Sequence, residues 1–429
     1  MTDFDYEEFI VKLYPLHRTL VSDDIDKTLD IIEEVLPDRF KNNFNIQKIP
    51  SGKKCWTWIA PKKYTVNSAY IETLDGEKII DFDDNALHLV SYSHSIDEVM
   101  GFEELEPHLN YSIARPGAIP WKFSYYSPGW GFCLSHEKFV MLDRDAKYHV
   151  FIDSSFDDDY LKIGELCIKG KTSKELLIVT NICHPYQVND SITGVAAVIE
   201  VLHRLSSYKF EKSLRILFLP ETIGSICYFS HNMSIVPNIE YGIFTEMLGN
   251  NDTLALQYSF QGDSLIDVIA EKVLQEHSGA YRTGDFRSIV GNDELVTNGP
   301  GLNIPTISLS RSKKTLDSFP EYHTSDDNPS LLEDRALEEA FTVLEKIVLW
   351  SDQNYYPKRN FTGPVFLSGY DLWGVWEDIP YGKEMVDKIM FRLEGELSVI
   401  EISEDIGLSF QETKRIIDAF IDKKLIQKI

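Results

Sequence analysis

Apolar runs and helically spaced apolar positions alternate through the middle of the chain. Residues 176–183 (LLIVTNIC) form a nearly continuous apolar run, which is typical of a strand buried on both faces. Apolar residues in 194–205 (GVAAVIEVLHRL) instead recur at helical spacing. The same two patterns return further along, as strands at 213–220, 241–248 and 307–310 and as a helix at 337–350. The alternation predicts an α/β fold with a mixed, mostly parallel sheet flanked by helices.

The segments before this α/β layer have a different pattern of apolar and polar residues. Residues 1 to about 36 show helical periodicity, broken at Ser22-Asp23-Asp24, which is a good helix N-cap. From about Ile49 to Ile163, short runs of Trp, Tyr, Val and Ile alternate with turn signals such as Asp75-Gly76, which indicates a β-rich unit. We therefore predict an α/β domain from residues 1–45 and 165–355, interrupted by a β-rich insert, or lid, at 46–164.

An aromatic stretch, PWKFSYYSPGWGFC (residues 120–133), lies inside the predicted insert. One interpretation is a packed β core with an aromatic corner. The other is a wall of a substrate pocket, because Tyr and Trp combine an apolar body with a polar tip. The sequence leaves both interpretations open.

A polar, proline-containing linker (SDQNYYPKRNFTGP) leads to a separate tail at residues 360–429. From Leu397 onward the pattern predicts a helix, a tight turn at Gly407, a second helix over about 409–423 and a short apolar end, as in a winged helix-turn-helix. The second helix carries mixed charges and no basic stripe. Nucleic-acid binding is therefore not expected, and a structural or protein-contact role is favoured.

The charge and the cysteines narrow the class of protein. A net charge of −26 argues against a non-specific nucleic-acid or anionic-membrane partner, because both need a basic face. The acidic N-terminus lacks the features of a signal peptide, and no apolar stretch approaches the roughly 18 residues of a membrane span. The five scattered cysteines predict free thiols in a reducing compartment. We expect a cytoplasmic protein without a membrane partner, and the sequence is compatible with a homo-oligomer.

Histidines and carboxylates follow the predicted strands. His184 ends the strand at 176–183, and the next loop leads to Asp190 just before a helix. Glu221 and Glu246 lie at the ends of the following two strands, and His323 lies in a polar loop before the last long helix. Because active residues of an open α/β sheet collect at the carboxyl ends of its strands, we expect these five residues to converge. Such a set suits a divalent metal with an open coordination position.

The order of these residues, together with four sequence blocks, carries a family resemblance. The blocks are SYYSPGWGFCLSH, HPYQVNDSITG, PETIGS and YHTSDDN. The chain resembles the co-catalytic zinc aminopeptidases, the clan that also contains the glutaminyl cyclases, and within it a bacterial aminopeptidase-like branch with a β-rich insert and a C-terminal winged helix. The resemblance runs over nearly the whole chain. It implies a zinc site with the ligands His184, Asp190, Glu246 and His323, and a general base at Glu221.

One position departs from the pattern of the clan. Where the clan has a Glu-Glu pair, this chain has Glu221-Thr222, and a threonine hydroxyl is a poor metal ligand beside a carboxylate. We therefore expect one tightly bound zinc ion, and a second, weaker ion stays open. A site made of His184, Asp190 and His323 alone is a further alternative, if Glu246 turns away.

Three further residues are predicted to bind substrate. Asp293 and Glu294 lie in the loop GNDELVTNG, where they are candidates to replace the missing carboxylate or to receive a substrate amine. Tyr322, next to the implied ligand His323, completes this set.

These residues predict a zinc-dependent, aminopeptidase-type hydrolase that cleaves an amide or peptide bond in a small molecule or short peptide. Metal-activated water attacks the carbonyl, and Glu221 acts as the general base. Two alternatives stay open. One is a glutaminyl-cyclase-like acyl transfer, in which no solvent oxygen enters the product. The other is a degenerate peptidase fold that serves as a binding module.

Overall fold

The computed structural model describes residues 4–125, 127–312, 319–379 and 381–429. The chain forms two compact units. The larger consists of residues 1–267 and 273–346, and the smaller of residues 268–272 and 347–429. The predicted division into core, insert and tail stays a prediction. None of the helices in the described ranges is long and apolar enough to cross a membrane.

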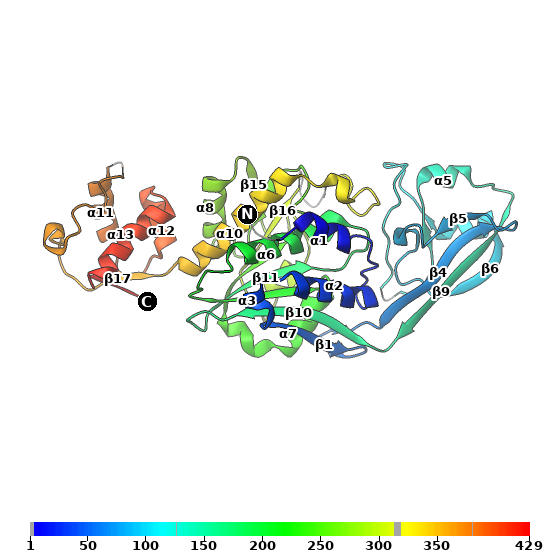
Figure 1. The fold of residues 1–429 in the computed structure, drawn as a ribbon, viewed down its shortest axis with the longest axis horizontal. Helices are drawn as coiled ribbons and strands as arrows, with labels where there is room; N and C mark the ends of the chain where they lie inside the picture. The colour runs from blue at the N-terminus through cyan, green and yellow to red at the C-terminus, as the bar shows by residue number, and fades with distance from the viewer. Residues whose placement is uncertain (1–3, 126, 313–318, 380) are drawn as a thin grey trace. The chain divides into compact units, whose positions relative to one another are not determined.

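An eight-stranded mixed sheet forms the centre of the larger unit (Figure 1). Its strands are β1 (Phe44–Pro50), β10 (Tyr160–Ile168), β11 (Glu175–Asn181), β12 (Ser213–Leu219), β13 (Ile239–Thr245), β14 (Leu254–Gln257), β15 (Tyr281–Gly284) and β16 (Thr306–Arg311). The strand order is β1-β10-β12-β11-β13-β16-β14-β15. Neighbours among β12, β11, β13 and β16 are parallel, whereas β1–β10, β10–β12 and β14–β16 are antiparallel. The predicted fold class is confirmed.

The central strands form where the sequence has apolar runs. Every residue of β11, β12 and β16 is buried, as expected of strands that are covered on both faces. The edge strand β1 alternates more in its burial, because one side of it faces solvent.

The helices of the α/β region are α1 (Tyr6–Leu13), α2 (Asp23–Val35), α3 (Asp38–Lys41), α6 (Thr193–Arg204), α7 (Ile223–His231), α8 (Leu265–His277), α9 (Glu294–Thr297) and α10 (Asp334–Gln353). Of these, α1, α2, α6 and α10 form where the sequence predicts helices, and the other four were not predicted. Helix α2 begins at the predicted cap, where the Ser22 hydroxyl accepts a hydrogen bond from the backbone N–H of Ile25. Near the start of α6, a Cβ on Gly194 would lie 2.4 Å from the carbonyl oxygen of Thr245. Glycine therefore lets α6 approach the end of β13.

The residues between β1 and β10 form a second, smaller sheet within the larger unit. Its strand order is β5-β4-β9-β6. The elements of this segment are β2 (Lys54–Cys55), β3 (Trp58–Ile59), β4 (Lys63–Thr73), β5 (Lys78–Asp81), β6 (Ile96–Gly101), α4 (Phe102–Leu105), β7 (Leu109–Asn110), β8 (Phe132–Cys133), α5 (His136–Met141) and β9 (Lys147–Asp157). Strands β1 and β10 cross the predicted insert boundaries, because both pair in the main sheet. Tyr126 of the aromatic stretch lies outside the described residues.

The smaller unit contains the predicted helix–turn–helix. Its elements are β17 (Pro357–Arg359), α11 (Gly382–Met390), α12 (Val399–Ile406), α13 (Phe410–Asp422) and β18 (Ile426–Lys428). Gly407 ends α12 in the left-handed conformation, with φ +73°, and β17 pairs with β18 in antiparallel fashion. The Trp350 and Phe410 rings pack with their centroids 4.8 Å apart. The assignment as a winged helix stays a prediction.

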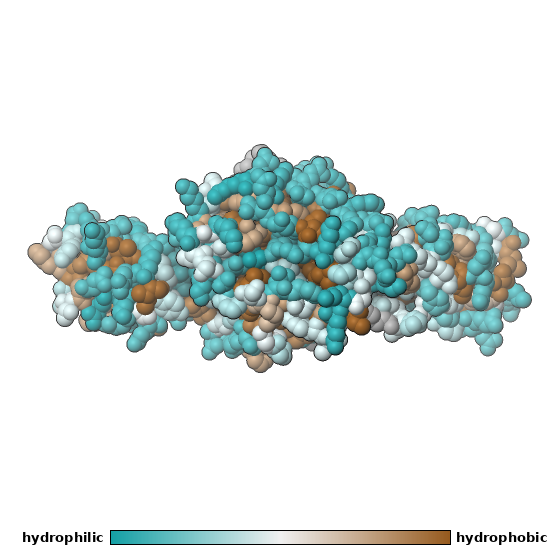
Figure 2. All heavy atoms as spheres, turned by 90° about the horizontal axis from the view of Figure 1, so that it is seen from below, coloured by the Kyte–Doolittle hydropathy of each residue, from teal (hydrophilic) through white to brown (hydrophobic). Residues whose placement is uncertain are grey.

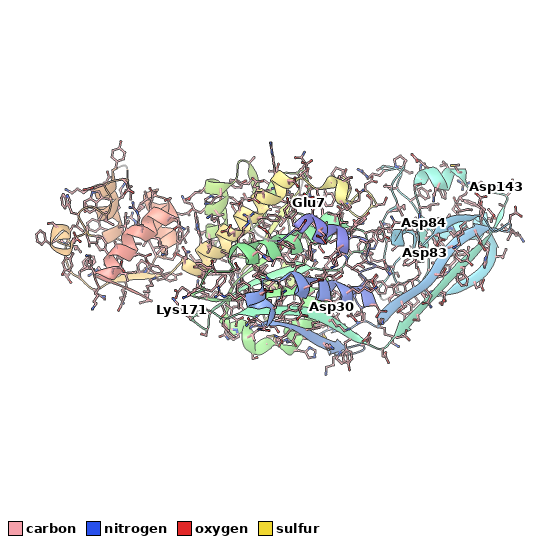
Figure 3. All side chains as sticks on the ribbon, viewed as in Figure 1. Glu7, Asp30, Asp83, Asp84, Asp143 and Lys171 are labelled. Atoms are coloured by element: carbon pink, nitrogen blue, oxygen red, sulfur yellow. The ribbon has the colours of Figure 1, made fainter. Side chains whose placement is uncertain are left out.

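The surface is mostly hydrophilic in the view of Figure 2, where apolar side chains form only small patches. Acidic residues contribute much of it, which agrees with the net charge of −26. Figure 3 labels six exposed charged residues of the larger unit, five of them acidic: Glu7, Asp30, Asp83, Asp84, Asp143 and Lys171.

Candidate metal centre

The candidate residues follow four neighbouring parallel strands. His184 and Asp190 come after β11, Glu221 after β12, and Glu246 directly after β13. His323 lies in the longer connection between β16 and α10. The carboxyl ends of parallel strands lie at one edge of a sheet, so these loops meet there.

His184, Asp190 and His323 form a compact cluster. Nδ1 of His184 lies 3.5 Å from Oδ1 of Asp190, and Nε2 of His323 lies 3.0 Å from Oδ2 of the same carboxylate. One ligand atom from each residue lies within 4.8 Å of the other two. His184 and Asp190 are buried, whereas the His323 side chain is 28% exposed. Solvent therefore reaches the cluster from the His323 side.

Arg18 holds the loop that carries His184. Its guanidinium is fully buried and donates hydrogen bonds to the carbonyl oxygens of Ile182 (3.0 Å), Cys183 (3.3 Å), His184 (2.7 Å) and Gln187 (3.3 Å). In an exposed loop, water donates hydrogen bonds to such carbonyl groups, whereas a buried loop needs donors from within the protein. Arg18 supplies them from a segment far away in the sequence.

Asp327 holds the loop that carries Asp190. Its carboxylate accepts hydrogen bonds from the backbone N–H groups of Asn189 and Asp190, at 3.0 to 3.1 Å. Burial raises the pKa of Asp327 to about 7. Asp327 belongs to the same block, YHTSDDN, as His323.

Glu221 faces the cluster from the end of β12. Its Oε2 lies 3.0 Å from Nε2 of His184, and its side chain is 28% exposed. The backbone N–H of Glu221 donates to the thiol of Cys183 at 3.2 Å. Glu221 therefore has contact with both solvent and a buried histidine. Its role as general base stays a prediction.

Glu221 sits at the start of a strained turn. Thr222 adopts φ +60° and ψ −62°, and the N–H of Ile223 donates to the carbonyl oxygen of Glu221 at 2.6 Å, which defines a γ-turn. Asp293 supports this turn, because its buried carboxylate accepts from the Thr222 N–H at 3.0 Å and from the Ser225 hydroxyl. Burial raises the pKa of Asp293 to about 7. Strain held in this way is a common feature of functional sites.

Glu246 lies outside the compact cluster of three. It is buried, and its Oε2 accepts a hydrogen bond of 2.8 Å from the side-chain amide of Asn292. Among the described residues, two groups of ligand atoms are close enough to hold a metal ion, one from Cys183, His184 and Glu221 and the other from His184, Asp190 and His323. Neither group contains Glu246. Its role as a fourth ligand stays a prediction.

Glu294 and Tyr322 border the site. The Glu294 carboxylate accepts two hydrogen bonds from the backbone N–H of Asn292, at 3.0 and 2.9 Å, and burial raises its pKa to about 7. The Tyr322 ring stacks on His323 at 3.7 Å between centroids. The predicted substrate-binding role of Asp293, Glu294 and Tyr322 stays a prediction.

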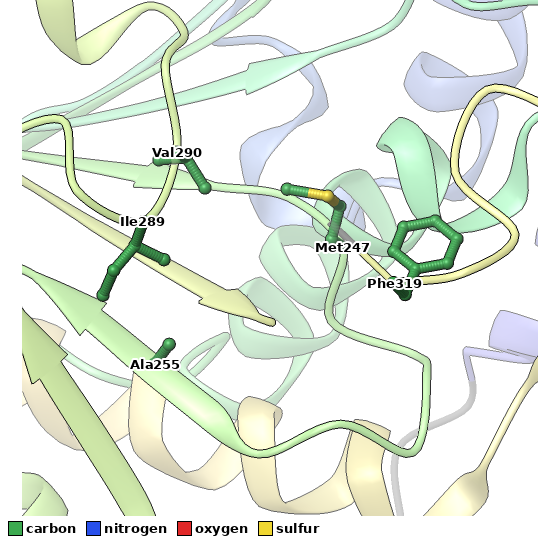
Figure 4. Packing of buried hydrophobic residues seen from close by; sticks show 5 residues of the cluster. All are labelled: Met247, Ala255, Ile289, Val290 and Phe319. Carbon is green, nitrogen blue, oxygen red and sulfur yellow. The ribbon is translucent and has the colours of Figure 1, made fainter. Parts of the chain in front are cut away.

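An apolar cluster adjoins these residues. Tyr322 packs against it, and one member, Met247, directly follows Glu246. Figure 4 shows its five buried members, Met247, Ala255, Ile289, Val290 and Phe319. This apolar cluster therefore borders the candidate site on the side of β13.

Trp121, from the aromatic stretch, covers the two histidines. Its ring meets His184 and His323 edge to face, with centroids 4.6 Å away in each case. Its backbone N–H also donates to the carbonyl oxygen of His323 at 2.7 Å. The stretch thus lies against the candidate site, as the pocket-wall interpretation expects.

The electrostatics of the site favour a bound cation. Burial lowers the pKa of His184, but the charge of Asp190 and smaller contributions outweigh it and raise the pKa well above its ordinary value. Burial raises the pKa of Glu246 well above its usual range, and the negative charges of Asp190 and Glu221 add to this. Several carboxylates thus gather in a buried place, where a metal ion would compensate their charge.

Sequence reasoning missed three residues that shape the site. Arg18 stands alone in an N-terminal segment with no motif, so no local signal points to it. Asn292 precedes Asp293 in a loop that the sequence did single out, and Asp327 lies in a block that carries the resemblance. Their neighbourhood was therefore visible in the sequence, although their contacts were not.

Comparison with known proteins shows the family of the chain. The family model described as "Domain of unknown function (DUF4910)" matches residues 7–354. A protein of Clostridium acetobutylicum is 34% identical over 424 residues, which cover 98% of this chain and 95% of that protein. It bears the provisional description of a polysaccharide biosynthesis protein with an aminopeptidase-like domain.

Solved structures show the same architecture. A crystal structure of a provisionally assigned peptidase from Clostridium acetobutylicum has a TM-score of 0.88 at 32% identity, covering 99% of this chain and 96% of that one. A zinc aminopeptidase from Bacillus subtilis has a TM-score of 0.61 at 11% identity, covering 82% and 96%. An M28 peptidase precursor from Shewanella amazonensis has a TM-score of 0.57 at 14% identity, covering 80% and 92%. The chain therefore belongs to the DUF4910 family and has the fold of the zinc aminopeptidase clan.

Proposed function

We propose that the protein is a zinc-dependent amide hydrolase of the aminopeptidase type. The observation that carries the proposal is the cluster of His184, Asp190 and His323, at the strand ends of an aminopeptidase fold, with Glu221 beside it. The second supporting fact is the fold itself, which the chain shares with a zinc aminopeptidase and an M28 peptidase precursor.

The cluster fits a zinc ion in donor chemistry and in size. Imidazole nitrogens and a carboxylate oxygen are common zinc donors, which lie about 2 Å from the ion and hence up to about 4 Å from one another. The candidate ligand atoms lie within 4.8 Å of one another, so small adjustments suffice. Three protein ligands leave a position open, as in catalytic zinc sites. A zinc ion supplies Lewis acidity, which makes water more acidic and polarises a carbonyl group.

Glu221 is the proposed proton carrier. Its carboxylate accepts the proton of the attacking water and then delivers that proton to the leaving amine. The hydrogen bond to His184 and the turn supported by Asp293 fix its position. A partly exposed carboxylate beside a buried histidine can exchange its proton with substrate without a large movement.

The substrate class is a small amide or a short peptide. The fold is shared with aminopeptidases, and the Clostridium relative carries a description from polysaccharide biosynthesis, which widens the class to amides of modified sugars. All five cysteines are free thiols, which is compatible with the predicted cytoplasmic location.

Zinc content and turnover together test the proposal. The purified full chain should hold close to one equivalent of zinc after dialysis, and hydrolysis in water enriched in heavy oxygen should place that oxygen in the acid product. Glu221→Gln should keep the zinc and lower kcat by roughly 100- to 10,000-fold. His323→Ala should lose zinc and activity together.

Three results would contradict this proposal. Protein without any transition metal would remove the hydrolase assignment. A product without solvent oxygen would favour acyl transfer. Full activity of Glu221→Gln would remove Glu221 from the mechanism.

A further inference from the structure

A row of aromatic rings leads away from the candidate metal centre. Trp121 meets the rings of His184 and His323, and the Phe123 centroid lies 4.8 Å from that of Trp121. Tyr125 continues the row, with its centroid 4.4 Å from that of Phe123. The three rings come from alternate positions of one segment, residues 121–125, and each contacts the next.

The row ends at a cavity of about 550 Å³ within the larger unit. Its walls are mainly apolar and include Ile59, Pro61, Tyr92, Tyr125, Pro128 and Phe156. This volume lies in the range of small-molecule sites, which is roughly 300–1,000 Å³. The cavity is distinct from the apolar cluster around Met247, because the two share no residue.

Tyr125 belongs to both the cavity and the aromatic row. Its ring lines the cavity and lies 4.9 Å from that of Tyr92, edge to face. The segment that covers the two histidines therefore also supplies a wall of the cavity.

The apolar side chains at the cavity are unusually exposed. Ile59 is 53% exposed and Phe156 is 39% exposed, on a chain whose net charge is −26. Phe123, on the way to the metal centre, is 45% exposed. Scattered apolar residues on a surface need no explanation, but apolar residues grouped around one cavity indicate a binding site.

We propose that this cavity binds an apolar group, either an aromatic ring or a branched aliphatic chain, of the substrate whose amide bond lies at the metal centre. The inference rests on the proposed function and names the part of the substrate that the insert recognises. An apolar group gains free energy when it leaves water for such walls. Four polar residues, Lys62, His94, Ser124 and Ser127, also line the cavity, but apolar atoms make up the larger part of its surface. The aromatic row then lies between the two parts of the substrate.

A binding experiment tests the cavity without any need for turnover. The probe is the apolar dye N-phenyl-1-naphthylamine, titrated against the full chain and followed by its fluorescence. Ile59→Glu places a charge at the cavity and should weaken dye binding at least tenfold. Val99→Glu is the control, because Val99 is 56% exposed on β6 and does not line the cavity. Equal dye binding by both variants would overturn the proposal.

A second titration tests the connection to the metal centre. The ligands are hydroxamic acids, which chelate zinc, with phenylalkyl chains of increasing length, compared with acetohydroxamic acid on the zinc-loaded protein. Beyond one chain length the affinity should rise at least tenfold, and Ile59→Glu should abolish this gain while Val99→Glu keeps it. Hydroxamates that bind equally well at every length would overturn the inference and leave the zinc site intact. Tighter binding of sugar hydroxamates than of phenylalkyl ones would overturn the apolar ligand class.

The two proposals fail in different ways. A protein that holds no zinc and no hydroxamate would overturn the proposed hydrolase function, and with it the assignment of the cavity to a substrate. The dye titration would still report whether the cavity binds apolar groups. If the protein binds zinc but Ile59→Glu leaves dye binding unchanged, the proposal for the cavity is overturned and the proposed hydrolase function is not.

Discussion

The guanidinium of Arg18 donates a hydrogen bond of 2.7 Å to the carbonyl oxygen of His184. The two residues are 166 positions apart in the sequence, and both are buried. Because the same guanidinium also reaches the carbonyl oxygens of Cys183 and Gln187, it fixes the whole loop that presents His184. The N-terminal segment is therefore part of the candidate site, although it supplies no ligand.

Replacing Arg18 should damage both the fold and the metal site. Arg18→Met leaves several buried carbonyl groups without a donor, so the free energy of unfolding should fall by about 3 kcal/mol, and zinc affinity should fall with it. Urea unfolding and elemental analysis measure the two effects. Arg39→Met is the control, because Arg39 also donates to two backbone carbonyl groups, those of Ser206 and Tyr208, but is exposed. A similar small loss in both variants would contradict the positioning role of Arg18.

The contacts of Glu246 lead to a prediction about metal ligands. Since Glu246 accepts from Asn292 and lies outside the compact cluster, Glu246→Gln should keep most of its zinc. Asp190→Asn should lose it, because Asp190 lies between both histidines. Zinc content after dialysis measures the difference. Equal loss in the two variants would make Glu246 a ligand, as the sequence predicts.

Restoring the second glutamate of the clan should change the number of zinc ions. Thr222→Glu adds an anionic ligand at the position where this chain differs from the Glu-Glu pair of the clan. Zinc content should therefore rise from about one toward two equivalents. Thr222→Gln has nearly the same size without the charge and should stay near one. Both replacements are unbranched, so neither adds the steric cost of a β-branched residue at φ +60°. A rise in both variants, or in neither, would contradict the role assigned to Thr222.

The sequence predicted the central part of the fold well. The runs at 176–183 and 213–220 form β11 and β12. A continuous apolar run of this length is typical of a strand that is buried on both faces, so its structure can be predicted. The strands β14 and β15 were not predicted. They have four residues each and lie at one edge of the sheet, where the local sequence pattern is weak. They form because β14 pairs with β16 and β15 pairs with β14.

The candidate site was predictable only in part. Residues that follow strands, such as His184 and Glu221, could be found because strand ends are visible as the ends of apolar runs. The contact of Glu246 with Asn292 could not be predicted, because it depends on how two loops that follow different strands pack together. Arg18 was invisible for the same reason, since a single arginine in a helical segment ordinarily lies on the surface.

Stability at acid pH should depend on His17. The Nε2 atom of His17 is buried and has no hydrogen-bond partner among the described residues, and burial lowers the pKa of His17 to about 4, from an ordinary value of 6.5. Below pH 6.5 the unfolded chain binds a proton that the folded chain does not, so this part of the stability is complete above pH 6.5 and is lost as the pH falls toward 4. The loss should be on the order of 1 kcal/mol near pH 5.5.

The variant His17→Phe should remove this loss, because a phenylalanine keeps the ring contact with Phe82, whose centroid lies 5.0 Å away, and does not titrate. His149→Phe is a control of opposite sign, since hydrogen bonds to Glu72 and Asp97 raise the pKa of His149, and its contribution is lost as the pH rises. Urea unfolding of the wild type and the two variants between pH 5.5 and 8 measures how the free energy of unfolding depends on pH in each protein. A wild-type and a His17→Phe protein with the same dependence on pH would show that His17 is protonated in the folded chain, against the burial of its Nε2 atom.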